Sequence, residues 1–209
     1  MSQVGKKFPN ISVNAMNEMG DTFKLNVLHE ALDNKKKIIL FWYPKDFTFV
    51  CPTEIHAFQA KASEFEKRNT MVIGASCDTA EVHFAWLSTA KDNGGIEGVT
   101  FPLLADSNRQ LAETLDILDT QFIGTEDDYV IEGDNVTYRA TYLIDEKGTI
   151  FHESVNVMPL GRNVDEYLRL IDGYTHNQVH GEVCPANWEE GKDTLSESRD
   201  SVASYLAKH

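Results

Sequence analysis

The hydrophobic and polar positions of this 209-residue chain alternate between short apolar runs and stretches with helical spacing. Residues 38–43 and 71–76 are unbroken apolar runs rich in β-branched and aromatic side chains, which predicts two strands buried on both faces. From Pro52 to Arg68 the apolar residues recur every three or four positions, the spacing of an amphipathic helix. Because proline suits the first turn of a helix, this helix is predicted to begin at residue 52.

Further elements are predicted along the rest of the chain. They are helices over 79–93, 107–118 and 163–174, a strand over 101–104, and a hairpin of strands 138–145 and 149–155 around Glu146-Lys147-Gly148. This order predicts an α/β sandwich, close to the thioredoxin layout, with a central mixed sheet flanked by helices. The chain after residue 176 is polar and contains glycine and proline. We therefore expect a globular domain over 1–176 and a C-terminal tail over 177–209, which lies on a surface or on a neighbouring subunit.

The chain is acidic, with 33 Asp and Glu against 19 Lys and Arg and a formal net charge of -14. This excess disfavours nucleic-acid binding, which needs clustered Lys and Arg to neutralise phosphates. The first residues lack the apolar core of a signal peptide, and no run approaches the ~18 apolar residues of a membrane span. We expect a cytoplasmic protein that binds neither nucleic acid nor membrane, in a compartment where thiols are kept reduced.

Three cysteines are present, without a Cys-x-x-Cys pair or the Cys/His spacing of a zinc site. Cys51 stands directly before Pro52, at the start of the predicted helix. The positive end of a helix stabilises a thiolate, which is the nucleophilic form of cysteine. Thr48 can direct its hydroxyl at the same place, and Arg139 can add a permanent cation from a strand expected beside the 38–43 strand. The alternative is that Cys51 is a small buried hydrophobic residue.

The residues around Cys51 favour the nucleophile. The pattern Pro44-x-x-x-Thr48-x-x-Cys51 resembles the active-site motif of peroxiredoxins. The run Phe-Thr-Phe-Val-Cys-Pro-Thr-Glu over 47–54 is similar to that of their typical 2-Cys branch. A match of this length and order is specific, and it makes the reading of Cys51 as a buried structural residue the weaker one.

The resemblance extends over nearly the whole chain. The sequence His-Gly-Glu-Val-Cys-Pro-Ala-Asn-Trp over 180–188 resembles the segment that carries the resolving cysteine of the typical 2-Cys branch. Segments 139–145 and 160–166 also match. The tail over 188–195 is closer to bacterial alkyl hydroperoxide reductase C subunits than to the eukaryotic members.

The resemblance implies a thiol peroxidase that reduces hydrogen peroxide and organic hydroperoxides. Cys51 would be the peroxidatic cysteine, which attacks the O–O bond and becomes a sulfenic acid. Pro44 would shield the pocket, Thr48 would hydrogen-bond the peroxide, and Arg139 would hold Cys51 as a thiolate and polarise the departing oxygen. Glu54 is similar to the family residue that orients this arginine.

The resemblance also implies that Cys184 is the resolving cysteine, which condenses with the sulfenic acid to a disulfide, normally on the partner subunit. It implies a homodimer or a decameric ring, with thioredoxin or a flavoprotein disulfide reductase as electron donor and a secondary chaperone role. No metal and no organic cofactor is required. The preferred peroxide, the donor and the choice between dimer and decamer stay open.

Two alternative functions are a disulfide oxidoreductase on the same fold and a chaperone without catalysis. The first favours a nearby resolving thiol, as in Cys-x-x-Cys, and the chain has none. The second does not account for the peroxiredoxin motif before Cys51. Cys77, in the loop after the 71–76 strand, is interpreted as structural. The histidines that could act as bases are interpreted as surface residues or satisfied core residues: His56, His83 and His180.

The stretch from Asp106 to Arg139 is longer than the connection that the family resemblance implies, by roughly ten residues. Between Arg109 and Arg139 there is no Lys or Arg, whereas acidic residues accumulate. A solvated insertion is the simpler interpretation. A docking patch for a reductant is the alternative.

Overall fold

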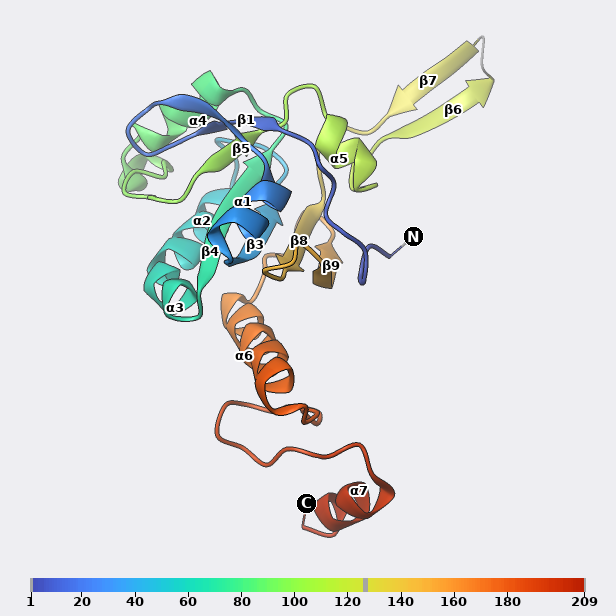
Figure 1. The fold of residues 1–209 in the computed structure, drawn as a ribbon. Coiled ribbons are helices and arrows are strands. Elements are labelled where there is room, and N and C mark those ends of the chain that lie inside the picture. Colours follow the sequence, from blue (N-terminus) through green and yellow to red (C-terminus); the bar gives the residue numbers. More distant parts are fainter. Residues whose placement is uncertain (1, 126–127, 209) are drawn as a thin grey trace. The chain divides into compact units, whose positions relative to one another are not determined.

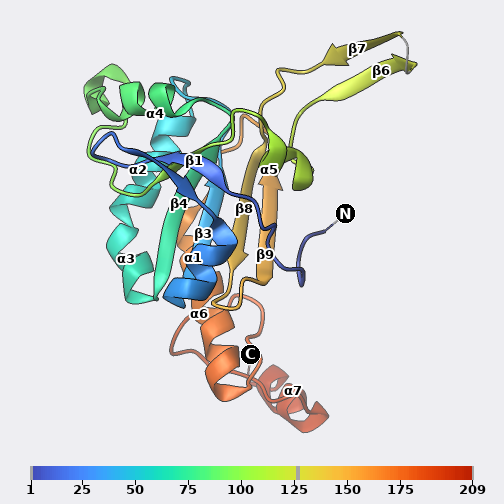
Figure 2. The ribbon, with the colours of Figure 1, turned by 45° about the horizontal axis from the view of Figure 1, so that its top comes forward.

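The computed structural model describes residues 2–125 and 128–208, and the chain divides into two compact units, Met1–Arg162 and Asn163–His209. The first unit is built on a seven-stranded sheet with the strand order β2-β1-β5-β4-β3-β8-β9 (Figures 1 and 2). Strand β4 is parallel to both β3 and β5, and the other neighbouring pairs are antiparallel. The sheet is therefore mixed, as predicted.

The first unit contains most of the secondary structure of the described residues. The strands of its large sheet are β1 (Val13–Met16), β2 (Thr22–Leu25), β3 (Lys37–Trp42), β4 (Thr70–Ser76), β5 (Leu103–Ala105), β8 (Arg139–Ile144) and β9 (Ile150–Asn156). Its helices are α1 (Val27–Asn34), α2 (Cys51–Ala60), α3 (Ala62–Lys67), α4 (Ala80–Leu87) and α5 (Gln110–Thr114), with a 3₁₀ turn η1 (Lys91–Asn93). A separate two-stranded ribbon joins β6 (Gln121–Thr125) to β7 (Asp128–Glu132).

Strand β3 lies at the centre of the sheet, and its side chains alternate between two hydrophobic layers because successive residues of a strand point to opposite faces. Ile38, Leu40 and Trp42 belong to a core that also contains buried residues of α1 and α5. Phe41, on the opposite face, stacks on Phe58 of α2 with ring centroids 4.0 Å apart. Helices thus cover both faces, which confirms the predicted α/β sandwich.

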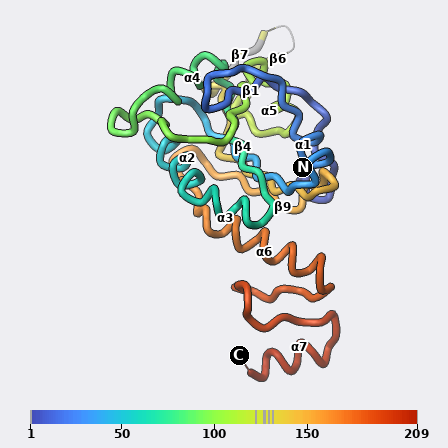
Figure 3. The backbone as a smooth tube through the Cα atoms, turned by 60° about the vertical axis from the view of Figure 1, so that its left-hand side comes forward, coloured from blue at the N-terminus to red at the C-terminus, as the bar shows by residue number. Residues whose placement is uncertain are grey.

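The predicted helix over 52–68 is two helices, and it begins one residue earlier, at Cys51. At Lys61 the backbone leaves the helical conformation, with φ -105° and ψ 6°, and α3 starts at the next residue. Figure 3 shows α2 and α3 following one another along the backbone. Phe58 of α2 and Phe65 of α3 are both buried, with ring centroids 6.1 Å apart. The break therefore preserves the predicted apolar face while separating the Cys51 end from α3.

Two other predicted helices are shorter than expected. Helix α4 ends at Leu87 rather than at the Gly94-Gly95 pair, because the hydroxyls of Ser88 and Thr89 donate hydrogen bonds to carbonyls one turn back. Gly95 instead packs against the Thr89 backbone, where a Cβ atom would stand 1.9 Å from the carbonyl oxygen. Helix α5 covers only the middle of the predicted 107–118 helix.

The β6–β7 ribbon extends away from the large sheet (Figures 1 and 2) and occupies the acidic stretch between Arg109 and Arg139. Its base is paired: Leu118 and Thr137 form an isolated bridge, and the Asp119 N–H donates to the Val136 carbonyl with N···O 3.0 Å. The two ends of the insertion therefore meet at one point, directly before β8. Along the described residues, the acidic stretch is therefore an antiparallel hairpin, with β6 paired to β7.

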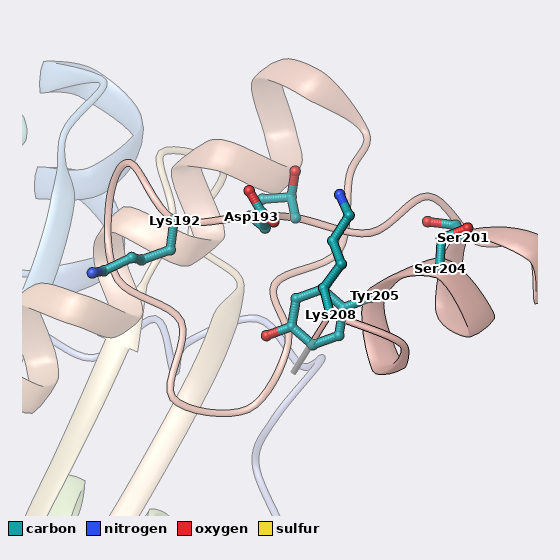
Figure 4. A pocket seen from close by; sticks show the side chains of 7 residues that line it. Lys192, Asp193, Ser201, Ser204, Tyr205 and Lys208 are labelled. Carbon is teal, nitrogen blue, oxygen red and sulfur yellow. The ribbon is translucent and has the colours of Figure 1, made fainter.

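The second unit contains α6 (Val164–His180) and α7 (Arg199–Leu206). Helix α6 runs six residues beyond its predicted end at 174 and finishes at Gly181, whose φ of 69° suits glycine. A hollow of about 400 Å³ near α7 is lined by polar side chains, among them Lys192, Tyr205 and Lys208 (Figure 4). Across residues 2–125 and 128–208, no helix combines the length and apolar character needed to cross a membrane.

Candidate active site

Cys51 is the first residue of α2 and its side chain is buried. The loop from Tyr43 to Val50 leads from the end of β3 to this point, so the sheet fixes where α2 begins. Val50 occupies the N-cap position without a side-chain cap, and its carbonyl accepts hydrogen bonds from the N–H groups of Thr53 and Glu54. The predicted placement of a cysteine at a helix N-terminus is confirmed.

Arg139 is the first residue of β8, and its side chain meets the Cys51 thiol. The antiparallel register of β3 and β8 pairs Phe41 with Thr141, which brings the start of β8 beside the end of β3. The Arg139 Nη1 atom lies 3.4 Å from Cys51 Sγ and donates to Glu54 Oε2 at 2.7 Å. Its Nε–H donates to the Met158 carbonyl, and no described residue accepts a hydrogen bond from Nη2. Nη2 is therefore free to bind a ligand oxygen.

Glu54 is buried between two arginines. Besides Arg139, it accepts three hydrogen bonds from Arg162: from Nε at 2.8 Å, from Nη2 at 2.8 Å and from the backbone N–H at 2.9 Å. Burial alone would raise the pKa of Glu54, but the hydrogen bonds and charge of Arg162, with the charge of Arg139, hold that pKa below its usual value. Glu54 is thus an anion that fixes the position of Arg139.

Arg162 is a residue of this site that the sequence analysis did not single out. Its side chain is 1% exposed, its Nη1 donates to the Ala140 carbonyl at 3.0 Å, and its guanidinium lies over the Phe41 ring at 5.3 Å from the centroid. Such a geometry suits arginine, whose planar fork both chelates a carboxylate and stacks on an aromatic ring. The signal in the sequence was the match of 160–166 to the family, which carried no residue role.

A cavity of about 300 Å³ opens in front of this arrangement. It is lined by Pro44, Lys45, Thr48, Phe49, Val50, Asp134, Val136, Arg139, Met158 and Pro159. The Thr48 hydroxyl donates to the Lys45 carbonyl at 2.9 Å, which leaves its oxygen lone pairs as acceptors. Five of the six predicted site residues therefore lie together in the first unit, and three of them line the cavity.

The sixth, Cys184, belongs to the second unit. It is half-buried, and its thiol lies 3.6 Å from the Gly173 carbonyl oxygen of α6. Partial burial raises its pKa, against the opposing charge of Arg169. An isolated bridge between Val183 and Leu195 holds the neighbouring backbone.

Cys77, directly after β4, differs from Cys51 and Cys184. It is buried in the core cluster, and burial together with the Asp106 charge raises its pKa to about 12. A thiol with such a pKa stays protonated at neutral pH and is a poor nucleophile.

The histidines have structural partners. Both ring nitrogens of the buried His83 are engaged, Nδ1 with Asp46 Oδ2 at 2.7 Å and Nε2 with the Leu104 carbonyl at 3.1 Å. Burial alone would lower the pKa of His83, but the hydrogen bond and charge of Asp46 outweigh it and raise the pKa. His56 Nε2 contacts the Gly95 carbonyl at 3.0 Å. The interpretation of His83 as a satisfied core residue is confirmed.

The sequence is similar to known protein families and to individual known proteins. The AhpC/TSA family model matches residues 4–153, and the model for the C-terminal domain of 1-Cys peroxiredoxin matches residues 174–208. Peroxiredoxin-1 of Gekko japonicus is 42% identical over 174 residues, which cover 83% of this chain and 81% of that protein. Alkyl hydroperoxide reductase C of Buchnera aphidicola subsp. Schizaphis graminum is 37% identical over 209 residues, which cover 100% and 99%.

Solved structures show the same likeness. The crystal structure of the reduced 2-Cys peroxiredoxin of Plasmodium vivax superposes with a TM-score of 0.88 at 36% identity, covering 99% of this chain and 100% of that one. The structure of Enterococcus faecalis AhpC gives a TM-score of 0.75 at 30% identity, covering 88% and 100%. The predicted thioredoxin-like sandwich is confirmed by these neighbours.

Proposed function

This chain belongs to the AhpC/TSA family and is a thiol-dependent peroxidase, and on that premise we propose that Cys51 is the thiol that attacks the peroxide. The contact between Cys51 Sγ and Arg139 Nη1 at 3.4 Å is the observation that supports this assignment most directly. A guanidinium at this distance stabilises a thiolate and offers hydrogen bonds to a peroxide oxygen. No described residue donates a hydrogen bond to the Cys77 thiol, and burial outweighs the Arg109 charge and raises its pKa, which supports Cys51 over Cys77 as the attacking thiol.

In the first step, the Cys51 thiolate attacks one peroxide oxygen. An S–O bond forms while the O–O bond breaks, so the sulfur is oxidised to a sulfenic acid, and the departing oxygen takes a proton and leaves as water or an alcohol. Arg139 Nη2 stabilises the charge on the departing oxygen, and the Thr48 hydroxyl accepts a hydrogen bond from the peroxide O–H. Glu54 holds Arg139 in place, and Pro44 shields the cavity from bulk water.

In the second step, the thiol of Cys184 condenses with the sulfenic acid, which forms an S–S bond and releases water. We propose that the partner subunit of a homodimer supplies this cysteine, and that dimers can assemble into a decameric ring. A dithiol donor, either thioredoxin or a flavoprotein disulfide reductase, then reduces the disulfide. In this scheme residues 1–176 carry the peroxidase site and residues 177–209 carry the resolving cysteine, in a cytoplasmic protein with a secondary chaperone role.

Replacement of Cys184 by serine tests the resolving step. We expect the Cys184→Ser variant to consume one equivalent of peroxide per subunit and then stop, because the sulfenic acid has no thiol to condense with. Oxidised wild-type protein should run as a covalent dimer on a non-reducing gel, and this band should be missing for Cys184→Ser but present for Cys77→Ser. A wild-type band of monomer size would show that the disulfide is instead formed within one chain.

Hydrogen exchange tests the movement that this disulfide demands. Two cysteines can be bridged only when their Cα atoms lie within about 7 Å of each other. Cys51 is buried at the start of α2, so the first turn of α2 must open before Cys51 can meet Cys184. Opening one terminal turn has a low free-energy cost. We therefore expect amides 49–54 to exchange faster in the disulfide form than in the reduced form. Equal protection in both forms would exclude this opening.

A further inference from the structure

The return strand of the inserted ribbon leads to the mouth of the active site. Asp134 and Val136 follow β7 directly, and both line the cavity that Arg139 and Thr48 also line. Val136 is 8% exposed, whereas the Asp134 side chain is exposed to solvent. The insertion therefore supplies part of the wall that an incoming peroxide meets.

The backbone of this segment is held firmly on both sides of Asp134. Gly133 has a φ of +99°, and a Cβ atom there would lie 1.9 Å from the Asp119 carbonyl oxygen, so only glycine fits. Asn135 has a φ of 53°; its side-chain oxygen accepts a hydrogen bond from the Thr120 hydroxyl at 2.7 Å, and its carbonyl accepts one from Arg109 Nε at 2.8 Å. These contacts fix where Asp134 stands, although its side chain is in solvent.

The walls of the cavity fit an organic substituent better than hydrogen peroxide alone. Hydrogen peroxide is little larger than water, which occupies about 30 Å³, whereas the cavity holds about 300 Å³. Most of its lining is apolar, with Phe49, Val50, Val136, Met158 and Pro159. The charged groups are the cations Lys45 and Arg139 and the anion Asp134. Arg139 is already paired with Glu54, and no described residue hydrogen-bonds or ion-pairs with the Asp134 carboxylate.

We propose that Asp134 is a specificity-determining residue, which repels anionic hydroperoxides at the mouth and so selects uncharged organic hydroperoxides for the apolar cavity. Because Asp134 lines the cavity, a hydroperoxide with an anionic substituent would bring a second negative charge near this carboxylate as it enters, and like charges repel each other. This selection rests on the proposed attack by Cys51, whose neighbour Arg139 lines the same cavity. It gives the insertion a role in substrate choice rather than in docking a reductant.

The test compares two substrates that differ in one charge, cumene hydroperoxide and its para-carboxylate derivative. Reduced protein is mixed rapidly with each, and Cys51 oxidation is followed by tryptophan fluorescence, so that no electron donor is needed. We expect Asp134→Asn to raise the ratio of the carboxylate rate to the cumene hydroperoxide rate at least about threefold over wild type at low ionic strength. Added salt should speed the wild-type reaction with the carboxylate, because it screens the repulsion.

The matched control is Glu132→Gln, which removes the same charge from an exposed position of β7 that does not line the cavity. It should leave both rates near those of wild type, and Asp134→Glu should retain the wild-type selectivity. Any of three results overturns the proposal. Asp134→Asn could change the rates with both substrates by the same factor, Glu132→Gln could gain as much rate with the carboxylate as Asp134→Asn, or the wild-type rate with the carboxylate could be independent of salt. Reaction of Asp134→Asn with cumene hydroperoxide would agree with attack by Cys51 whatever the selectivity. Reaction of Cys51→Ser with either substrate would instead contradict the proposed function.

Discussion

The Cys51→Ser variant is expected to show no peroxide reduction above the background of the assay. A serine hydroxyl is not ionised at neutral pH and is a far weaker nucleophile than a thiolate, although it has nearly the same size. Removal of a nucleophile in other enzymes lowers turnover by factors on the order of 10⁶. Both the steady-state rate with a dithiol donor and the formation of sulfenic acid, detected with a dimedone probe, should be lost.

Cys77→Ser provides the matched control, because it makes the same chemical change at a buried thiol to which no described residue donates a hydrogen bond. It should retain most of the wild-type rate constant for the reaction with peroxide. Two results would show that Cys51 is not the attacking thiol. One is substantial turnover in Cys51→Ser, and the other is loss of the first step in Cys77→Ser with a native circular dichroism spectrum.

The second large effect is expected for Glu54→Gln, in both stability and rate. The Glu54 carboxylate receives four hydrogen bonds from Arg139 and Arg162, and its side chain is 3% exposed. A glutamine has no charge and only one acceptor oxygen, and its amide would face guanidinium donors. Removing one partner of a buried ion pair costs about 3–5 kcal/mol of unfolding free energy. Release of Arg139 from its position should slow the attack by about 10²-fold, as for other small misplacements of catalytic groups.

Denaturant midpoints and rapid-mixing rates measure the two effects separately. Glu64→Gln is the control, since Glu64 pairs with Lys67 and Arg68 on the surface, and it should leave both quantities close to wild type. Because the folded pKa of Glu54 lies below its ordinary value of 4.5, its ion pairs stabilise the fold above that pH and are lost as the pH falls through the folded pKa. Glu54→Gln should therefore lose less stability than wild type on acidification below pH 4.5. If Glu54→Gln has the same rate and the same unfolding free energy as wild type, Glu54 does not position Arg139.

The position of Cys51 at a helix N-terminus could be predicted from the local pattern of apolar and polar residues. An apolar run, a polar loop and an amphipathic helix in succession fix the end of β3 and the start of α2, so Cys51 could be placed at a helix N-terminus before its surroundings were known. The Arg139 contact depends on the register of β8 against β3. The hairpin signal after residue 145 predicts the pairing of β8 with β9, whereas the register of β8 against β3 is a finding of the structure.

Features that depend on distant contacts could not be anticipated in the same way. Arg162 lies 108 residues from Glu54 along the chain, and its own neighbourhood contains no apolar or helical pattern that points toward Glu54. The break at Lys61 also gives no signal in the sequence, because the apolar spacing continues across it into α3. The strands β1 and β2 were missed because each has four residues, too few for an alternating pattern to stand out.

The paired base of the β6–β7 ribbon makes this hairpin an exchangeable module. Because Leu118 and Thr137 lie side by side, the chain between them can lengthen, shorten or change charge without moving β8 in the sheet. Cys51, Arg139 and Arg162 would then stay in place while the wall of the cavity changes. Evolution can diversify such a peroxidase by altering one surface hairpin and leaving its core unchanged. The same junction offers protein engineers a site for grafting other hairpins.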